Sequence, residues 1–99
     1  TITSISNARP QQPNPAATAV IDARGRYLLP GFINAHAHLH DERAGLAQPW
    51  EYQLKTWLAC GITTVRDVGS DYSKTSRLRE LSRKNEIIAP RIFLYAVWS

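Results

Sequence analysis

The stretch PGFINAHAHLH, residues 30–40, holds all three histidines of this 99-residue chain, at every second position. Successive side chains of a β-strand point to opposite faces. If residues 31–39 form a strand, one face is wholly apolar and suited to packing under helices: Ile33, Ala35, Ala37 and Leu39. The other face becomes more polar toward its C-terminal end: Phe32, Asn34, His36 and His38. Parallel α/β folds carry their chemistry at that end of the strands.

His36 and His38 are therefore predicted to direct one ring nitrogen each at a common centre. A divalent metal accepts such nitrogens, at about 2.0–2.1 Å for zinc, whereas imidazoles buried without a partner are costly. The alternative is a pair of core histidines that hydrogen-bond to neighbouring backbone, and the apolar strand after Pro30-Gly31 favours the metal. His40 falls where the strand gives way to a loop, so we expect it to contact substrate or to support a metal ligand.

After residue 30 the sequence alternates between strand and helix patterns. Strands are predicted over residues 31–39, 62–69 and 91–98, with helices over 49–60 and 70–88 between them. Asp71 or Ser73 can cap the second helix. The strand starts repeat at about 30 residues, close to the roughly 31 of a (β/α)₈ barrel. A doubly wound open sheet has units of similar length, so the spacing predicts a parallel α/β fold without choosing between the two.

Residues 1–29 have a different pattern. TITSIS, residues 1–6, alternates and is β-branched, which predicts a short strand, and a proline-rich loop follows it. AVIDARGRYLL, residues 19–29, has two apolar arms around Ala-Arg-Gly-Arg and predicts a hairpin in which Gly25 takes a positive φ. We expect these strands to form the edge of a small β unit.

The composition is that of an ordinary globular protein, with 43% hydrophobic and 20% charged residues. The net charge of +4 comes from residues 74–91, which we interpret as a solvated helix face with a Glu80–Lys84 pair, because no nucleic-acid-binding motif accompanies it. The single cysteine, Cys60, is expected to be a buried, inert thiol. No apolar run approaches the roughly 18 residues of a membrane span. A cytoplasmic location is expected; because the chain starts at Thr1, a missing secretory or periplasmic signal is left open.

Three segments together resemble a known family: VIDARGRYLLPGFINAHAHLH, CGITTVRDVG and APRIFLYA. They are similar to the N-terminal part of the amidohydrolase superfamily, and most similar to its imidazolonepropionase-like and Xaa-Pro dipeptidase-like branch. The resemblance covers the chain from about Ile2 to Ala96. It implies that residues 1–29 are part of a small composite β-sandwich domain. It also implies that residues 30–99 are the N-terminal portion of a metal-dependent hydrolase barrel, an incomplete (β/α)₈ TIM barrel.

The same resemblance implies that His36 and His38 bind a divalent metal, zinc being the expected ion, with one or two ions in the complete enzyme. In such enzymes a lysine, two further histidines and an aspartate come from later strands, beyond Ser99 here. No catalytic residue is therefore expected within this chain. Arg66 and Asp67 must face opposite ways on their strand, and we expect a structural ion-pair role for them before a catalytic one, with substrate contact or support of a ligand as the alternative.

The predicted function is that of a fragment of a metal-dependent amidohydrolase, which uses a metal-activated water on C–N bonds of an amide, a cyclic amide or a dipeptide. The 99 residues alone are expected to be inactive. The expected partner is a small-molecule or dipeptide substrate, with no nucleic acid and no membrane, and the full-length form could be a homo-oligomer. Two alternatives are a non-catalytic amidohydrolase-like scaffold protein and a small basic α/β binding module.

Overall fold

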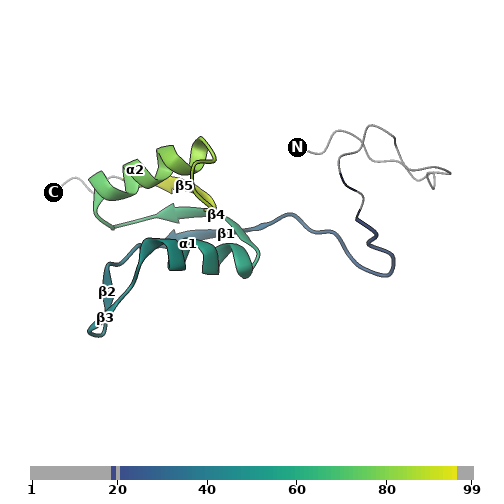
Figure 1. The fold of residues 1–99 in the computed structure, drawn as a ribbon, viewed down its shortest axis with the longest axis horizontal. Helices are drawn as coiled ribbons and strands as arrows, with labels where there is room; N and C mark the ends of the chain where they lie inside the picture. Colours follow the sequence, from purple (N-terminus) through teal and green to yellow (C-terminus); the bar gives the residue numbers. More distant parts are fainter. Residues whose placement is uncertain (1–18, 20, 96–99) are drawn as a thin grey trace.

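The computed structural model describes residue 19 and residues 21–95 of the chain. The strand expected at residues 1–6 lies outside this part. The described elements, in chain order, are β1 (Phe32–Ala37), β2 (Glu42–Arg43), β3 (Leu46–Ala47), α1 (Trp50–Ala59), β4 (Ile62–Asp67), α2 (Tyr72–Arg83) and β5 (Arg91–Leu94). The predicted order of three longer strands separated by two helices is confirmed (Figure 1).

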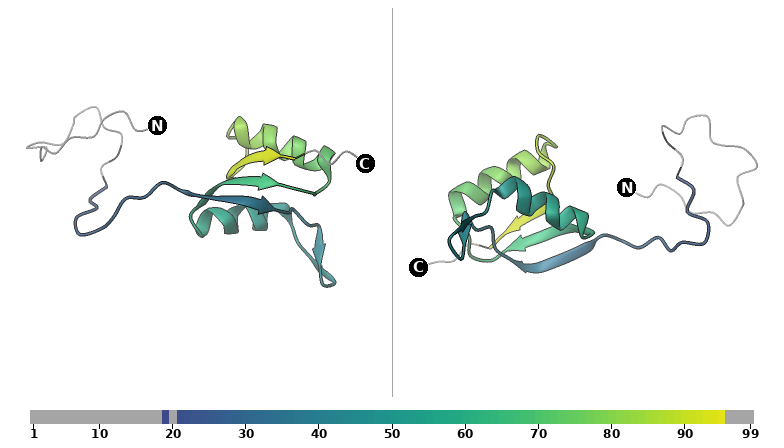
Figure 2. Two further views of the ribbon diagram at one scale, coloured as in Figure 1. Left: turned by 180° about the vertical axis from the view of Figure 1, so that it is seen from behind. Right: turned by 60° about the horizontal axis from the view of Figure 1, so that its bottom comes forward.

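The three longer strands form one parallel sheet in the order β1-β4-β5. Both helices lie on the same face of this sheet, as the right-hand view of Figure 2 shows, with α1 against β4 and α2 against β5. This is the parallel α/β arrangement that the alternating pattern predicted. In the described part of the chain no helix covers the other face, where Phe93 and Tyr95 are 52% and 60% exposed.

The core lies between the sheet and the two helices. Its buried apolar side chains come from every long element: Ala37, Leu39, Leu54, Val65, Leu78 and Ile92. Leu54 of α1 is completely buried, which removes apolar surface worth about 2 kcal/mol from water. Trp50 and Trp57 pack against this cluster along the same stripe of α1.

The ends of the helices follow local chemistry. Gly61, with φ 78°, follows the last turn of α1, a conformation that glycine adopts without steric cost. Asp71 caps α2, and its side chain accepts a hydrogen bond from the Lys74 N–H at 2.7 Å. The helix ends at Arg83 rather than near residue 88, because Asn85 takes a left-handed φ of 58°.

Three expectations need correction. The arms around Gly25 do not pair: the turn forms, with φ 72°, but the described residues before Phe32 contain no strand. Cys60 is exposed rather than buried, because it follows the last residue of α1 at the surface. Glu80 pairs with Arg79 and Arg83 at 3.2 and 3.3 Å, not with the predicted lysine.

A small hairpin after β1 was not predicted. Its strands β2 and β3 are antiparallel and are joined by Ala44 and Gly45, with φ 53° and 77°. Positive φ at both central positions is the geometry of a type I′ turn, which matches the twist of a two-residue hairpin. The hairpin extends beyond the C-terminal end of β1, away from the sheet (Figure 2, left). Within the described ranges no helix is long and apolar enough to cross a bilayer.

Candidate metal centre at the end of the first strand

His36 and His38 lie together at the C-terminal end of β1. Their Nε2 atoms are 3.2 Å apart, and the ring centroids are separated by 5.1 Å with 63° between the ring planes. His36 is exposed and His38 is half-buried. The two rings converge through their tips, which are the atoms that a shared ion would contact.

The separation fits two ligands of one ion. Two nitrogens that each lie about 2.05 Å from a tetrahedrally coordinated zinc are about 3.3 Å apart. The alternative is an N–H···N hydrogen bond, in which one Nε2 carries the proton. A metal requires the lone pair of both Nε2 atoms, so the two states differ in the tautomer of one ring. The donor atoms present therefore fit a divalent ion, and metal binding stays a prediction.

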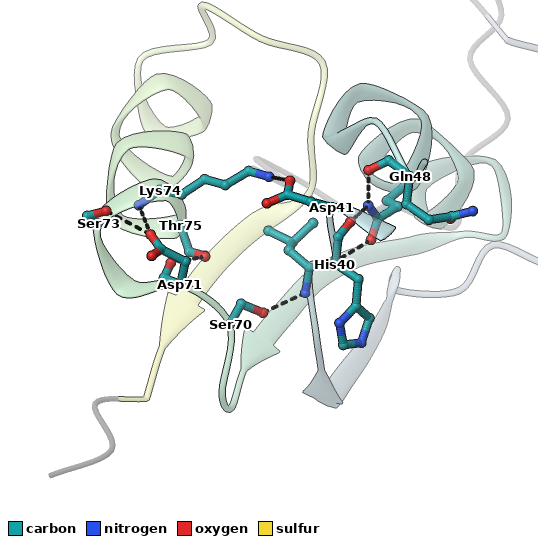
Figure 3. A network of polar contacts seen from close by, with 10 residues as sticks. His40, Asp41, Gln48, Ser70, Asp71, Ser73, Lys74 and Thr75 are labelled. Atoms are coloured by element: carbon teal, nitrogen blue, oxygen red, sulfur yellow. Dashed lines mark hydrogen bonds and ion pairs between the residues drawn. The ribbon is translucent and has the colours of Figure 1, made fainter. Parts of the chain in front are cut away.

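His40 does not join this pair. Its ring stacks on that of His38, with centroids 5.6 Å apart and 21° between the planes. In Figure 3 the His40 ring points away from the hydrogen-bonded cluster around its own backbone. Among residue 19 and residues 21–95, no three His, Cys, Asp or Glu side chains come close enough to hold a metal together. The described site thus offers two nitrogens.

Gln53 of α1 fixes the backbone after the histidine pair. Its side chain accepts from the His40 N–H at 3.2 Å and donates to the His40 carbonyl at 2.6 Å and the Gln48 carbonyl at 2.8 Å. Asp41 forms an ion pair with Lys74 of α2 (Figure 3). The hairpin loop is thereby tied to both helices. The role of Gln53 was not predicted, because this residue contacts residues five and 13 positions away and belongs to no local motif.

Arg66 lies on β4 and is exposed, and its Nε donates to the carbonyl of Ala35 at 2.8 Å. Asp67 is only 4% exposed, and its Oδ1 accepts hydrogen bonds from the Gly69 N–H, the Ser70 N–H and the Ser70 hydroxyl at 3.1, 3.0 and 2.8 Å. The two side chains differ in burial, as expected for opposite faces. Neither forms an ion pair within the described residues, where both bind backbone groups instead, so the ion-pair role stays a prediction.

The segment after Asp67 touches the histidine strand. The Ser70 hydroxyl accepts from the Leu39 N–H at 2.6 Å, and the Val68 N–H donates to the Ala37 carbonyl at 3.0 Å. A β-carbon built on Gly69 would lie 3.4 Å from Cε1 and 3.6 Å from Nδ1 of His38. The Nδ1 edge of His38 therefore faces this segment, while its Nε2 faces His36.

Hydrogen bonding also sets the charge at the start of α2. The pKa of the Asp71 carboxyl is lowered, chiefly by the hydrogen bond from the Lys74 N–H and next by the one from the Ser73 hydroxyl. A carboxylate at this position is favourable because the N-terminus of a helix carries a partial positive charge. Asp71 therefore acts on the helix and lies outside the histidine pair.

Comparison with known proteins relates the chain to a family of enzymes. The family described as "Amidohydrolase family" matches residues 27–97, a span that contains every described strand and helix and the histidine pair. The chain belongs to the amidohydrolase family. An allantoinase from Enterococcus faecalis (strain ATCC 700802 / V583) is 36% identical over 52 residues. That alignment covers 50% of this amidohydrolase chain and 12% of the allantoinase. No solved structure matches the chain significantly.

Proposed function

We propose that this amidohydrolase chain is part of an enzyme that hydrolyses C–N bonds, and that His36 and His38 are ligands of one divalent ion, with zinc the expected one. The observation that carries the proposal is the 3.2 Å separation of the two Nε2 atoms. Family membership supports the reaction class. A second ion in the complete enzyme would need ligands from other parts of the protein.

A divalent ion at this position would supply Lewis acidity toward a scissile carbonyl and would acidify a water. The chain's own residues hold the site. To hold the ion, His36 and His38 would both present unprotonated Nε2 atoms, which requires that each neutral ring carry its proton on Nδ1. For His38 that edge lies against the segment at Gly69. No carboxylate of the described residues joins the pair, which supports the proposal that residues 1–99 alone do not turn over substrate.

The proposed substrate is a small molecule with an amide, a cyclic amide or a dipeptide bond. Similarity to an allantoinase adds allantoin to the compounds to be tested. The resemblance to the imidazolonepropionase-like and Xaa-Pro dipeptidase-like branch gives a cyclic amide and a dipeptide as the other candidates. We further propose that residues 30–99 form the first part of a (β/α)₈ barrel and that residues 1–29 belong to a β-sandwich domain. The bare sheet face with Phe93 and Tyr95 supports the barrel, whose interior would bury it.

The test is a zinc titration of the full chain by competition with a fluorescent chelator. The unmodified chain and the His40→Ala variant are expected to bind one Zn²⁺ with the same affinity. His36→Ala and His38→Ala each remove one of two ligands and should weaken binding by at least about tenfold. Equal zinc affinity in the unmodified chain and the His36→Ala/His38→Ala double variant would contradict the proposal. Equal affinity is also the result expected if the protein is a non-catalytic amidohydrolase-like scaffold.

A further inference from the structure

The pairing between β1 and β4 is irregular at two places, between Phe32 and Ile33 and between Asn34 and Ala37, and the second irregularity spans the position of His36. Asn34 lies opposite Val65 and Ala37 lies opposite Asp67, so three steps along β1 correspond to two steps along β4. One residue of β1 is therefore extra, as in a β-bulge. Such a break interrupts the alternation of faces. Ile33, which precedes the break and was predicted to share the helix-covered face with Ala37, is 70% exposed, in agreement with a change of face between the two residues.

Two side chains hold the backbone around the extra residue. Arg66 Nε donates to the carbonyl of Ala35, the residue before His36, at 2.8 Å. Asn34 Oδ1 accepts from the His36 N–H at 3.1 Å. Polar side chains thus bind the backbone on the N-terminal side of His36. On its C-terminal side the Val68 N–H binds the Ala37 carbonyl.

The break changes where the His36 ring points. In a regular strand, residues i and i+2 are about 6.7 Å apart and their side chains run parallel. Here the ring centroids are 5.1 Å apart and the Nε2 atoms 3.2 Å apart, so the rings lean toward each other. β-Bulges are over-represented next to active sites, where they re-aim a side chain.

We propose that Arg66, together with Asn34, is a positioning residue that holds this bulge and thereby aims Nε2 of His36 at Nε2 of His38. The role in metal affinity rests on the proposed function, whereas the convergence of the rings does not. Charge alone would give the opposite effect: a guanidinium cation near a cation site raises the free energy of the bound ion. If Arg66 raises the affinity for the ion, it must do so through its hydrogen bond to the Ala35 carbonyl and not through its charge.

Positioning and charge repulsion predict opposite changes in zinc affinity for Arg66→Met. This substitution keeps much of the side-chain volume and removes both the charge and the hydrogen-bond donor. Positioning predicts that the zinc affinity of the full chain falls by about tenfold, in the range for residues that support a metal ligand. Removal of a repelling charge would raise it. Arg66→Lys can still donate to one carbonyl oxygen and should recover most of the affinity. Arg77→Met, on the exposed face of α2, is the matched control and should leave affinity unchanged.

A measurement without metal separates this proposal from the function it rests on. The nuclear Overhauser effect between ring protons of His36 and His38 should be present in the metal-free chain and in Arg77→Met, and lost in Arg66→Met. Asn34→Ala provides a second route to the same loss if Arg66→Met unfolds. Unchanged ring contacts and unchanged or tighter zinc binding in Arg66→Met and Asn34→Ala would overturn the proposal. Equal zinc affinity of the unmodified chain and His36→Ala would overturn only the metal assignment.

Discussion

The two connections from strand to helix differ in length and in what they do. The one after β1 runs over residues 38–49, contains the β2–β3 hairpin and carries His38 and His40. The one after β4 runs over residues 68–71 only, and its hydrogen bonds centre on Asp67 and Ser70. The Ser70 hydroxyl and the Val68 N–H of the short connection bind the backbone of Leu39 and Ala37, next to the histidine pair. The loop that carries candidate ligands is thus held by a neighbouring loop that carries no candidate ligand.

The largest expected effect is at Asp67, the last residue of β4, whose side chain holds the short connection. Asp67→Ala removes an acceptor that takes three hydrogen bonds and leaves the Gly69 and Ser70 N–H groups without it. Hydrogen bonds to charged groups contribute about 1.5–3 kcal/mol each and are not additive, so we expect a loss of about 3 kcal/mol in the free energy of unfolding. Urea denaturation measures this. Asp67→Asn keeps a carbonyl acceptor and should lose less; a loss below about 0.5 kcal/mol for Asp67→Ala would contradict the comparison.

Gln53→Ala makes the corresponding change in the long connection. It removes the partner of the His40 backbone and the Gln48 carbonyl, which lie closer to water than the groups around Asp67. Net contributions of about 1 kcal/mol are typical of such hydrogen bonds. We therefore expect a smaller loss of stability and faster hydrogen exchange at His40. Equal stability losses for Gln53→Ala and Asp67→Ala would remove the distinction between the loops.

The smallest expected effect is the pH dependence of α2. The pKa of Asp71 is lower in the folded chain than its usual value of about 3.9. Its contribution to stability is therefore present above the unfolded-state pKa and is lost as the pH falls through the folded-state pKa. The helical circular dichroism signal should weaken over that acidic range, and less so in Asp71→Ser, which keeps a cap without a titrating carboxyl. An identical acid transition in both chains would rule out this contribution.

Much of the fold could be predicted from local patterns. Periodicity placed three strands and two helices in order, and Asp71 was one of the two candidate caps, because these features depend on neighbouring residues. The β2–β3 hairpin was missed because alanine at positive φ is uncommon, so Ala44-Gly45 is a weaker turn signal than Asn-Gly. Asn85, which follows α2 with a left-handed φ, could have indicated the end of this helix, because asparagine is one of the residues that adopt that conformation after a helix.

The convergence of the two histidine rings could be predicted, whereas the residues that hold the backbone around them could not. Strand parity indicated that His36 and His38 share a side, and their Nε2 atoms do converge. Arg66 and Asp67 were expected to form ion pairs because charge is visible in a sequence. Their partners are instead a carbonyl 31 residues away and the N–H groups of a loop, which every sequence contains. The register break could not be predicted either, since it depends on how two distant strands pair.

The most direct test of the central claim is ¹⁵N nuclear magnetic resonance of the histidine rings while Zn²⁺ is added to the full chain. The account predicts that Nε2 of His36 and Nε2 of His38 shift together and saturate at one ion per chain, while both nitrogens of His40 keep their positions. A shift of only one of the two Nε2 atoms, or a response that begins at His40, would contradict a shared ion between His36 and His38.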